Sequence, residues 1–286
     1  MTAHLPTGRS AKLPVTIIVM TRDEAVNIDA CLASCVPYCA QVVVVDSSSI
    51  DGTAAIAAKH GVEIINFRWN GRYPKKKQWC LENLNISQPW TMLLDADEQL
   101  TPAMRTEMAE RLSDDAVELG FYITAQVGYD GRILRHGRKH RKLSLFRTDA
   151  ARFPEIDDLD IQAMWEVEGH YQPIINGPIG RFAAPIIHLD AKGRDAWISR
   201  HRRYALWAAE MRRRDALRDV EAAEPLGRRV AKRTLNRVPA KPLLAWADSY
   251  LWQQGWRDGR AGLAYAADRF RYYRAIDRAH RVQRVQ

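Results

Sequence analysis

The fold is decided by the stretch WTMLLDADE, which runs from Trp90 to Glu98. A short apolar run that ends abruptly in acidic residues is typical of a buried strand whose carboxyl end reaches the edge of a sheet. In an open α/β sheet, ligands bind outside the carboxyl ends of the strands. Asp95 and Asp97 flank one small residue, so their carboxylates can hold a hard divalent cation, Mg²⁺ or Mn²⁺, whose other positions stay open to phosphate oxygens.

Strand and helix patterns alternate over the first 125 residues. Apolar, often β-branched runs predict strands at residues 15–20, 41–46, 63–67 and 90–94. Helical spacing and capping signals predict helices between and after them, at residues 28–35, 53–59, 76–84 and 102–112, the last with Thr101 as N-cap. This alternation indicates an α/β fold with a mostly parallel sheet and right-handed crossovers.

The pattern changes twice further along the chain. Between residues 121 and 189 the runs are short and rich in Gly and Pro, which predicts a small antiparallel addition that covers the sheet. From Asp195 onward apolar and aromatic residues recur three and four apart, as in helices packed against a core. We therefore expect a flexible N-terminus at 1–13, an α/β domain at 14–190 and a helical region at 191–286.

The charge is distributed unevenly. The whole chain of 286 residues carries a formal net charge of +9. From Ala191 to the end there are 23 lysines and arginines against 10 aspartates and glutamates, giving +13, and the first 190 residues carry −4. Such a basic region suits an anionic membrane surface or a nucleic acid, and a solvated helical face is the alternative.

The hydropathy pattern predicts a cytoplasmic protein. The longest apolar runs fall far short of the roughly 20 residues that a transmembrane helix needs. Residues 1–13 are polar and lack the apolar segment of a secretory signal.

Two other predicted strands also end in polar groups. Asp46 closes the strand at 41–46, and the residues from Thr21 to Glu24 follow the first strand. Parallel strands present their carboxyl ends at one edge, so we expect these groups and Asp95 to face one crevice.

Three motifs together resemble a known family. They are TIIVMTRDE at residues 16–24, VVVDSSSIDGT at 43–53 and LLDADE at 93–98. In this order and spacing they resemble the family-2 inverting glycosyltransferases of GT-A (Rossmann-like) fold, and within that family the bacterial glucosyltransferases of lipopolysaccharide-core type. The likeness is close over residues 14–112, and GWRDGRAG at 255–262 resembles their C-terminal tail. It implies a nucleotide-sugar half at 14–112 and an acceptor half at 113–190.

The resemblance assigns donor-site residues by position. It implies that Thr21 and Glu24 line the nucleotide pocket, that Asp46 accepts a hydrogen bond from the pyrimidine base and that Asp51 closes the pocket. Lys77 and Asp95 would lie at the diphosphate, and Asp95 and Asp97 would hold the cation. In this donor site the chain departs from the family pattern in two places, where Gln78 and Asp23 each stand in the place of an Asn.

Transfer with inversion also needs a base that takes the proton of the acceptor hydroxyl. The acidic stretch from Glu155 to Glu168 is the expected source, although the family's His-Glu pair is replaced here by Trp165-Glu166. Glu166 is the first candidate, Glu168 the second and Asp158 the third.

Several histidines and arginines near this stretch have two interpretations. His136, Arg138, Arg141 and Arg147 either bind donor phosphates or an anionic acceptor, or form a solvated basic loop. His188 is interpreted as a structural histidine.

The resulting hypothesis is a metal-dependent hexosyltransferase with a nucleoside-diphosphate sugar donor, by family default a UDP sugar. Its acceptor would be a hydroxyl of a saccharide or lipid-linked saccharide in cell-envelope or lipopolysaccharide synthesis. The basic tail would dock on an anionic membrane, at the cytoplasmic face of the inner membrane, through arginines and three tryptophans: Arg212, Arg213, Arg214, Arg228, Arg229, Lys232, Arg233, Trp246, Trp252 and Trp256.

Three alternatives differ in what they require. A nucleotidyltransferase normally places a glycine-rich loop after its first strand, and the residues from Thr21 to Ala25 contain no glycine. A nucleic-acid-binding protein would use the basic tail but leaves the acidic strand ends unexplained, so no nucleic-acid partner is expected. An inactive scaffold would lack one of the key acids, whereas Asp46, Asp95 and Asp97 are all present.

Overall fold

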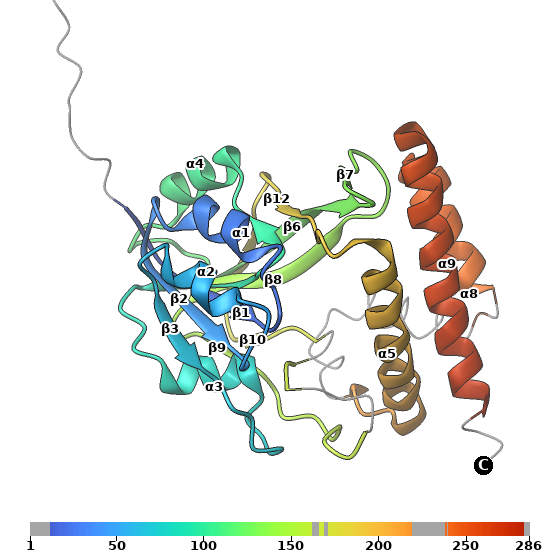
Figure 1. Ribbon diagram of the computed structural model, residues 1–286, viewed down its shortest axis with the longest axis horizontal. Coiled ribbons are helices and arrows are strands. Elements are labelled where there is room, and N and C mark those ends of the chain that lie inside the picture. The colour runs from blue at the N-terminus through green and yellow to red at the C-terminus, as the bar shows by residue number, and fades with distance from the viewer. Residues whose placement is uncertain (1–11, 162–165, 169–170, 219–237, 239, 283–286) are drawn as a thin grey trace, which may run out of the picture.

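The protein is an α/β structure built on one mixed sheet. The structure, a computed structural model, describes residues 12–161, 166–168, 171–218, 238 and 240–282. The strand order of the main sheet is β3-β2-β1-β4-β8-β6-β12-β5, with β7 and β11 also paired to β6. Helices flank this sheet, and the C-terminal helices stand beside it (Figure 1).

The first half of the sheet is parallel, as the sequence predicts. β1 lies between β2 and β4 and runs parallel to both, and β2 is parallel to β3. The strands are β1 (Leu13–Thr21), β2 (Cys39–Asp46), β3 (Glu63–Asn66) and β4 (Trp90–Asp95). The helices are α1 (Ile28–Cys35), α2 (Thr53–Ala58), α3 (Lys76–Asn83) and α4 (Pro102–Arg111), which the Thr101 hydroxyl caps by accepting from the Met104 N–H. The flexible N-terminus predicted at residues 1–13 ends one residue too late, because Leu13 already belongs to β1 and is buried.

The second half extends the sheet instead of covering it. β8 (His140–Arg147) pairs antiparallel with the free edge of β4, and β6 (Gly120–Tyr129) pairs antiparallel with β8. The prediction that this segment covers the sheet is therefore wrong, because β8 pairs directly with the open edge of β4. The remaining short strands are β5 (Glu98–Gln99), β7 (Arg132–Ile133), β9 (Ala151–Arg152), β10 (Ile174–Ile175), β11 (Ile179–Arg181) and β12 (Ile186–His188).

Both faces of the central strands are buried. Along β1 the side chains of Ile17 and Val19 pack with α1 and α4, whereas Ile18 and Met20 pack on the opposite face with Cys80 of α3 and Trp207. This explains why the strands are continuous apolar runs instead of alternating ones.

The C-terminal helices pack on one another and on the sheet. They are α5 (Gly193–Arg214), α8 (Lys241–Ala247), the π-helical η1 (Asp248–Trp252), the 3₁₀-helical η2 (Gly255–Asp258) and α9 (Gly259–Val282). α9 lies alongside both α5 and α8 (Figure 1). The buried Asp268 of α9 accepts a hydrogen bond from the Tyr129 hydroxyl of β6. It also accepts two from the Arg194 guanidinium of α5, at 2.7 and 2.9 Å. No helix among the described ranges is both long and apolar enough to span a bilayer.

The motif GWRDGRAG anchors the helical tail to the loop before β8. A Cβ on Gly262 would lie 1.9 Å from the Gly255 carbonyl oxygen, so this contact requires glycine. The Asp258 carboxylate accepts from the backbone N–H groups of His136 at 2.7 Å and Arg135 at 3.2 Å. The motif therefore fixes how the tail meets the sheet domain.

Candidate active site

The carboxyl ends of β1 and β2 are joined by hydrogen bonds. Thr21 and Asp46 are register partners, and the Thr21 hydroxyl donates to Asp46 Oδ1 at 2.6 Å. Asp46 also accepts from the backbone N–H and hydroxyl of Ser49, at 2.9 and 2.5 Å. The Asp46 carboxylate is buried and held in one orientation at the strand end.

Two loops beyond these strands are linked through the other predicted nucleotide-site residues. The Glu24 backbone N–H donates to Thr53 Oγ1 at 2.7 Å, and the Asp51 carboxylate accepts from the Ala25 N–H at 2.9 Å. The Glu24 carboxylate forms an ion pair at 2.6 Å with Lys192, which follows β12 in the chain. Burial raises the pKa of Glu24. Glu24 and Asp51 therefore hold the loops at these strand ends in place.

Lys76 lies between the ends of β1 and β2. Its ammonium donates to the Thr21 carbonyl at 3.0 Å and to the Ser47 hydroxyl at 2.7 Å, and only 1% of the residue is exposed. Burial lowers the pKa of Lys76 to about 8. A run of three lysines is typical of a solvated surface, but here both Lys75 and Lys76 are buried.

Lys77 sits at the N-terminus of α3 beside Asp95. Asp95 is the largest electrostatic influence that favours the charged form of Lys77, against the burial that lowers its pKa. The Glu168 carboxylate accepts from the backbone N–H groups of Lys77 and Gln78, at 2.7 and 2.8 Å. Glu168 therefore caps α3 from a distant segment.

Asp95, Asp97 and Glu98 form one charge cluster with Lys142 and His188. Lys142 lies opposite Asp95 when the β4–β8 register is continued, and its Nζ donates to Asp95 at 2.9 Å and to Glu98 at 2.5 Å. His188 is the register partner of Glu98, and its Nε2 lies 3.2 Å from Asp97 Oδ2. The cluster thus joins the ends of β4, β5, β8 and β12.

The charges in this cluster perturb one another strongly. Burial alone would raise the pKa of Asp95, but the nearby Lys142 and Lys77 lower it well below its usual range. Burial opposes the charged form of His188, yet the Asp97 carboxylate raises its pKa to about 9. Burial raises the pKa of Glu98 despite the Lys142 ammonium. At neutral pH His188 is therefore protonated and paired with Asp97.

The donor set of Asp95 and Asp97 fits a hard divalent cation bound together with a second ligand. Both contribute carboxylate oxygens, and the Asp95 side chain is 46% exposed. Across the described ranges, no three His, Cys, Asp or Glu side chains are placed to hold a metal ion by themselves. The protein would thus supply part of the coordination, and diphosphate oxygens and water the remainder.

The three acids considered as catalytic base occupy different environments. Asp158 is fully buried, 2.6 Å from Lys75 Nζ, and accepts from the Trp207 indole at 2.9 Å, which argues against contact with an acceptor. Glu168 is committed to the cap of α3. Glu166 keeps a partly exposed carboxylate 3.8 Å from Arg22, and its carbonyl accepts from the Lys76 N–H at 2.8 Å. Of these three, Glu166 has the most exposed side chain, and its only ion pair among the described residues is the long contact with Arg22.

Sequence reasoning missed three residues of the site. Lys76 is one of them, because the burial of two lysines in a run of three is not visible in the sequence. Lys142 belongs to no recognisable motif, although its position on β8 places it opposite Asp95 of β4. His188, interpreted as structural, contacts the acidic motif directly.

Comparison with known proteins identifies the family. The profile of Glycosyl transferase family 2 matches residues 16–164. The lipopolysaccharide core biosynthesis glycosyltransferase LpsC of Rhizobium meliloti is 32% identical over 150 residues, 50% of this chain and 54% of LpsC. An uncharacterized glycosyltransferase of Rickettsia conorii is 31% identical over 101 residues, 35% of each chain. The chain therefore spans about half the length of LpsC and about a third of the Rickettsia relative.

Solved structures give weaker similarities. The mannosyltransferase PcManGT from Pyrobaculum calidifontis, in complex with GDP-Man and Mn²⁺, superposes with a TM-score of 0.37 at 19% identity, over 91% of this chain and 87% of that one. The glucosyl-3-phosphoglycerate synthase from Mycobacterium tuberculosis gives 0.32 at 18% identity, over 46% and 51%. The family profile covers more than half of the sequence, including every strand end of the site except that of β12. The chain belongs to glycosyl transferase family 2.

Proposed function

We propose that the protein is an inverting, metal-dependent hexosyltransferase that uses a nucleoside-diphosphate sugar, by family default a UDP sugar. The observation that carries the proposal is the convergence of Asp46, Asp95 and Asp97 at one sheet edge with Lys76, Lys77 and Lys142 around them. Carboxylates held in one orientation can bind a cation or accept hydrogen bonds from a nucleotide base, and lysine ammonium groups can bind a diphosphate.

Each strand end has a distinct role in this proposal. Asp46, oriented by Thr21 and Ser49, faces the pyrimidine, and Glu24 and Asp51 hold the loops that enclose it. Lys77 lies at the diphosphate beside Asp95, where its charge opposes the negative charge of the leaving group.

Asp95 and Asp97 would hold the cation. When bound, the cation stabilises the charge of the departing nucleoside diphosphate. Lys142 and His188 hold these carboxylates in place and balance their charge.

Loss of Asp97 should therefore abolish turnover without unfolding the protein. We expect Asp97→Asn to lower the hydrolysis of UDP-glucose, measured with Mn²⁺ or Mg²⁺, by at least about 100-fold, because one cation ligand is lost. A chelator should stop the wild type. Asp114→Asn, which removes the same charge from an exposed loop, should hydrolyse normally. Full turnover of Asp97→Asn in the presence of chelator would contradict the proposal.

Glu166 is the proposed general base. Its support is that its carboxylate stays partly exposed, whereas Glu168 caps α3 and Asp158 is buried against Lys75. The proton of the acceptor hydroxyl would move to this carboxylate as the new glycosidic bond forms.

Glu166→Gln should keep UDP affinity within about twofold but lower transfer by roughly 10²- to 10⁴-fold, the usual contribution of a positioned base. Calorimetry and a coupled assay of UDP release give the two quantities. Glu168→Gln is the matched control and should mainly lower the free energy of unfolding, by about 1 kcal/mol for a weakened cap. If Glu168→Gln or Asp158→Asn instead loses turnover while its unfolding curve is unchanged, the base is that residue.

The acceptor is proposed to be a saccharide or lipid-linked saccharide of the cell envelope. The relationship to LpsC, whose name places it in lipopolysaccharide core biosynthesis, supports this assignment. Work on such an acceptor would take place in the cytoplasm, at the inner membrane.

The exposed side chains of residues 243–263 suit contact with an anionic membrane surface. Five large apolar side chains within 21 residues are 45–66% exposed: Leu243, Leu251, Trp252, Trp256 and Leu263. The exposed Arg257 and Arg260 flank them. The arginines of the expected cluster are engaged elsewhere, Arg212 with Asp277 and Arg213 and Arg214 with Glu210. Trp246 is half-buried, and Arg228, Arg229, Lys232 and Arg233 lie outside the described residues.

Replacing Trp256 and Leu263 by Ala should lower co-sedimentation with vesicles of phosphatidylglycerol in phosphatidylcholine by at least about fivefold, since interfacial apolar side chains and basic groups bind together. Wild-type binding should weaken with added salt. Leu206→Ala, an exposed apolar position on α5, is the control and should bind normally. Equal recovery of wild type and the double variant in the supernatant would refute docking through this surface.

A further inference from the structure

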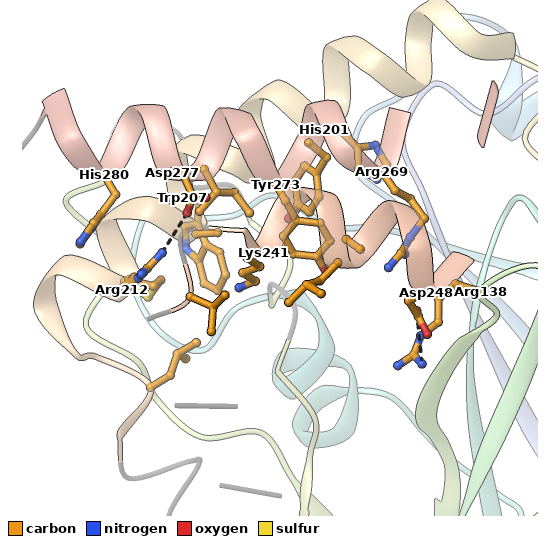
Figure 2. A pocket seen from close by; sticks show the side chains of 18 of the residues that line it. Arg138, His201, Trp207, Arg212, Lys241, Asp248, Arg269, Tyr273, Asp277 and His280 are labelled. Atoms are coloured by element: carbon orange, nitrogen blue, oxygen red, sulfur yellow. Dashed lines mark hydrogen bonds and ion pairs between the residues drawn. The ribbon is translucent and has the colours of Figure 1, made fainter. Parts of the chain in front are cut away.

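A large cavity lies between the start of β8 and the helices α5, α8 and α9. Its volume is about 1710 Å³. Figure 2 shows side chains from these helices reaching into one common space, with Lys241 and Tyr273 near its middle and Arg138 and Asp248 at one end. The strand-end carboxylates do not line it, so it is a separate feature beside the candidate active site.

The lining of this cavity is strongly basic. Its described residues include nine lysines and arginines and three aspartates. Two of the aspartates are paired, Asp277 with Arg212 at 3.1 Å and Asp248 with Arg138 at 3.7 Å. The remaining positive charge favours an anionic ligand, and arginine is the side chain best suited to phosphate.

The walls also carry six aromatic side chains. Trp197, Trp207 and Trp252 and three tyrosines of α9 line the space. Flat apolar rings next to hydrogen-bonding groups suit a ligand that has both an apolar face and polar substituents, as a sugar ring has. A simple inorganic anion would not use these surfaces.

Arg269 of α9 supplies a donor inside the cavity. Its Nε is buried and has no hydrogen-bond partner among the described residues, while its guanidinium lies 6.0 Å and 5.8 Å from the ring centres of Tyr265 and Tyr273. Buried donors in native proteins are usually satisfied, so a missing partner points to a ligand acceptor.

The cavity is connected to the candidate active site by a short chain of contacts. Tyr265, on the cavity wall, lies with its hydroxyl 3.1 Å from His140 Nε2. The His140 ring is 6.0 Å from that of His188, and His188 Nε2 is 3.2 Å from Asp97. His140 and His188 therefore link the cavity wall to the carboxylates beside which the donor sugar would lie.

We propose that this cavity is the acceptor subsite and that it binds a saccharide carrying a phosphate group, with Arg269, Arg141 and Lys139 facing the phosphate and the aromatic side chains packing on the sugar rings. The assignment rests on the proposed glycosyltransferase function and adds the chemical class of its acceptor. The tail then serves specificity as well as attachment, because α5, α8 and α9 form most of the subsite.

The test is calorimetric titration of the full chain with four probes: glucose 6-phosphate, glucose, inorganic phosphate and UDP with Mn²⁺. Glucose 6-phosphate should bind more tightly than glucose and inorganic phosphate, because only it engages both the arginines and the aromatic rings. Arg269→Gln should weaken it at least about tenfold. Arg141→Gln, at an exposed position that should not affect folding, should weaken it similarly. Arg132→Gln, exposed on β7 and outside the cavity lining, is the charge-matched control and should bind as the wild type does.

Three results would overturn the assignment. The first is that the wild type binds glucose 6-phosphate no more tightly than glucose, and the second is that Arg132→Gln loses as much affinity as the cavity variants do. The third is that the cavity variants lose affinity only for phosphatidylglycerol vesicles, which would make the ligand a lipid headgroup. UDP separates the two claims. Intact UDP binding without sugar-phosphate binding rejects the subsite alone, whereas absent UDP binding in the wild type rejects the proposed function.

Discussion

The register of β1 against β2 and β4 is the constraint on which the site depends. It pairs Thr21 with Asp46 and Met20 with Asp95, so the polar groups that follow three apolar strands emerge at one edge. Because both faces of β1 are buried, a slip of one residue would turn its side chains to the opposite faces and move these groups apart. The same strand register is therefore required both to pack the core and to place the site residues.

The acidic edge needs compensating cations, and distant segments supply them. Lys76 of α3 contacts the ends of β1 and β2, whereas Lys142 of β8 and His188 of β12 contact the acids at the end of β4 and in β5. Carboxylates buried without such partners would be protonated or would destabilise the fold. The same arrangement provides positive charge around the place proposed for a diphosphate, so stability and ligand binding use the same groups.

The sequence predicts the parallel half of the fold and the acids at its edge, because buried strands and the residues that end them are local patterns. Asp46, Asp95 and the Thr101 cap follow from such patterns and lie where expected at the strand and helix ends. Lys142 and His188 do not follow, since their contacts depend on β8 and β12 pairing far along the chain. The burial of Lys76 and the use of Glu168 as a cap depend on tertiary packing in the same way. The roles of the site residues in catalysis stay predictions.

Crystals grown with UDP and Mn²⁺, measured at the manganese absorption edge, test the central claim most directly. We expect one strong anomalous peak within coordination distance of the Asp95 or Asp97 carboxylate, with the diphosphate beside it near Lys77 and the uracil at Asp46. A nucleotide bound at another surface, or a manganese peak remote from both carboxylates, would contradict it.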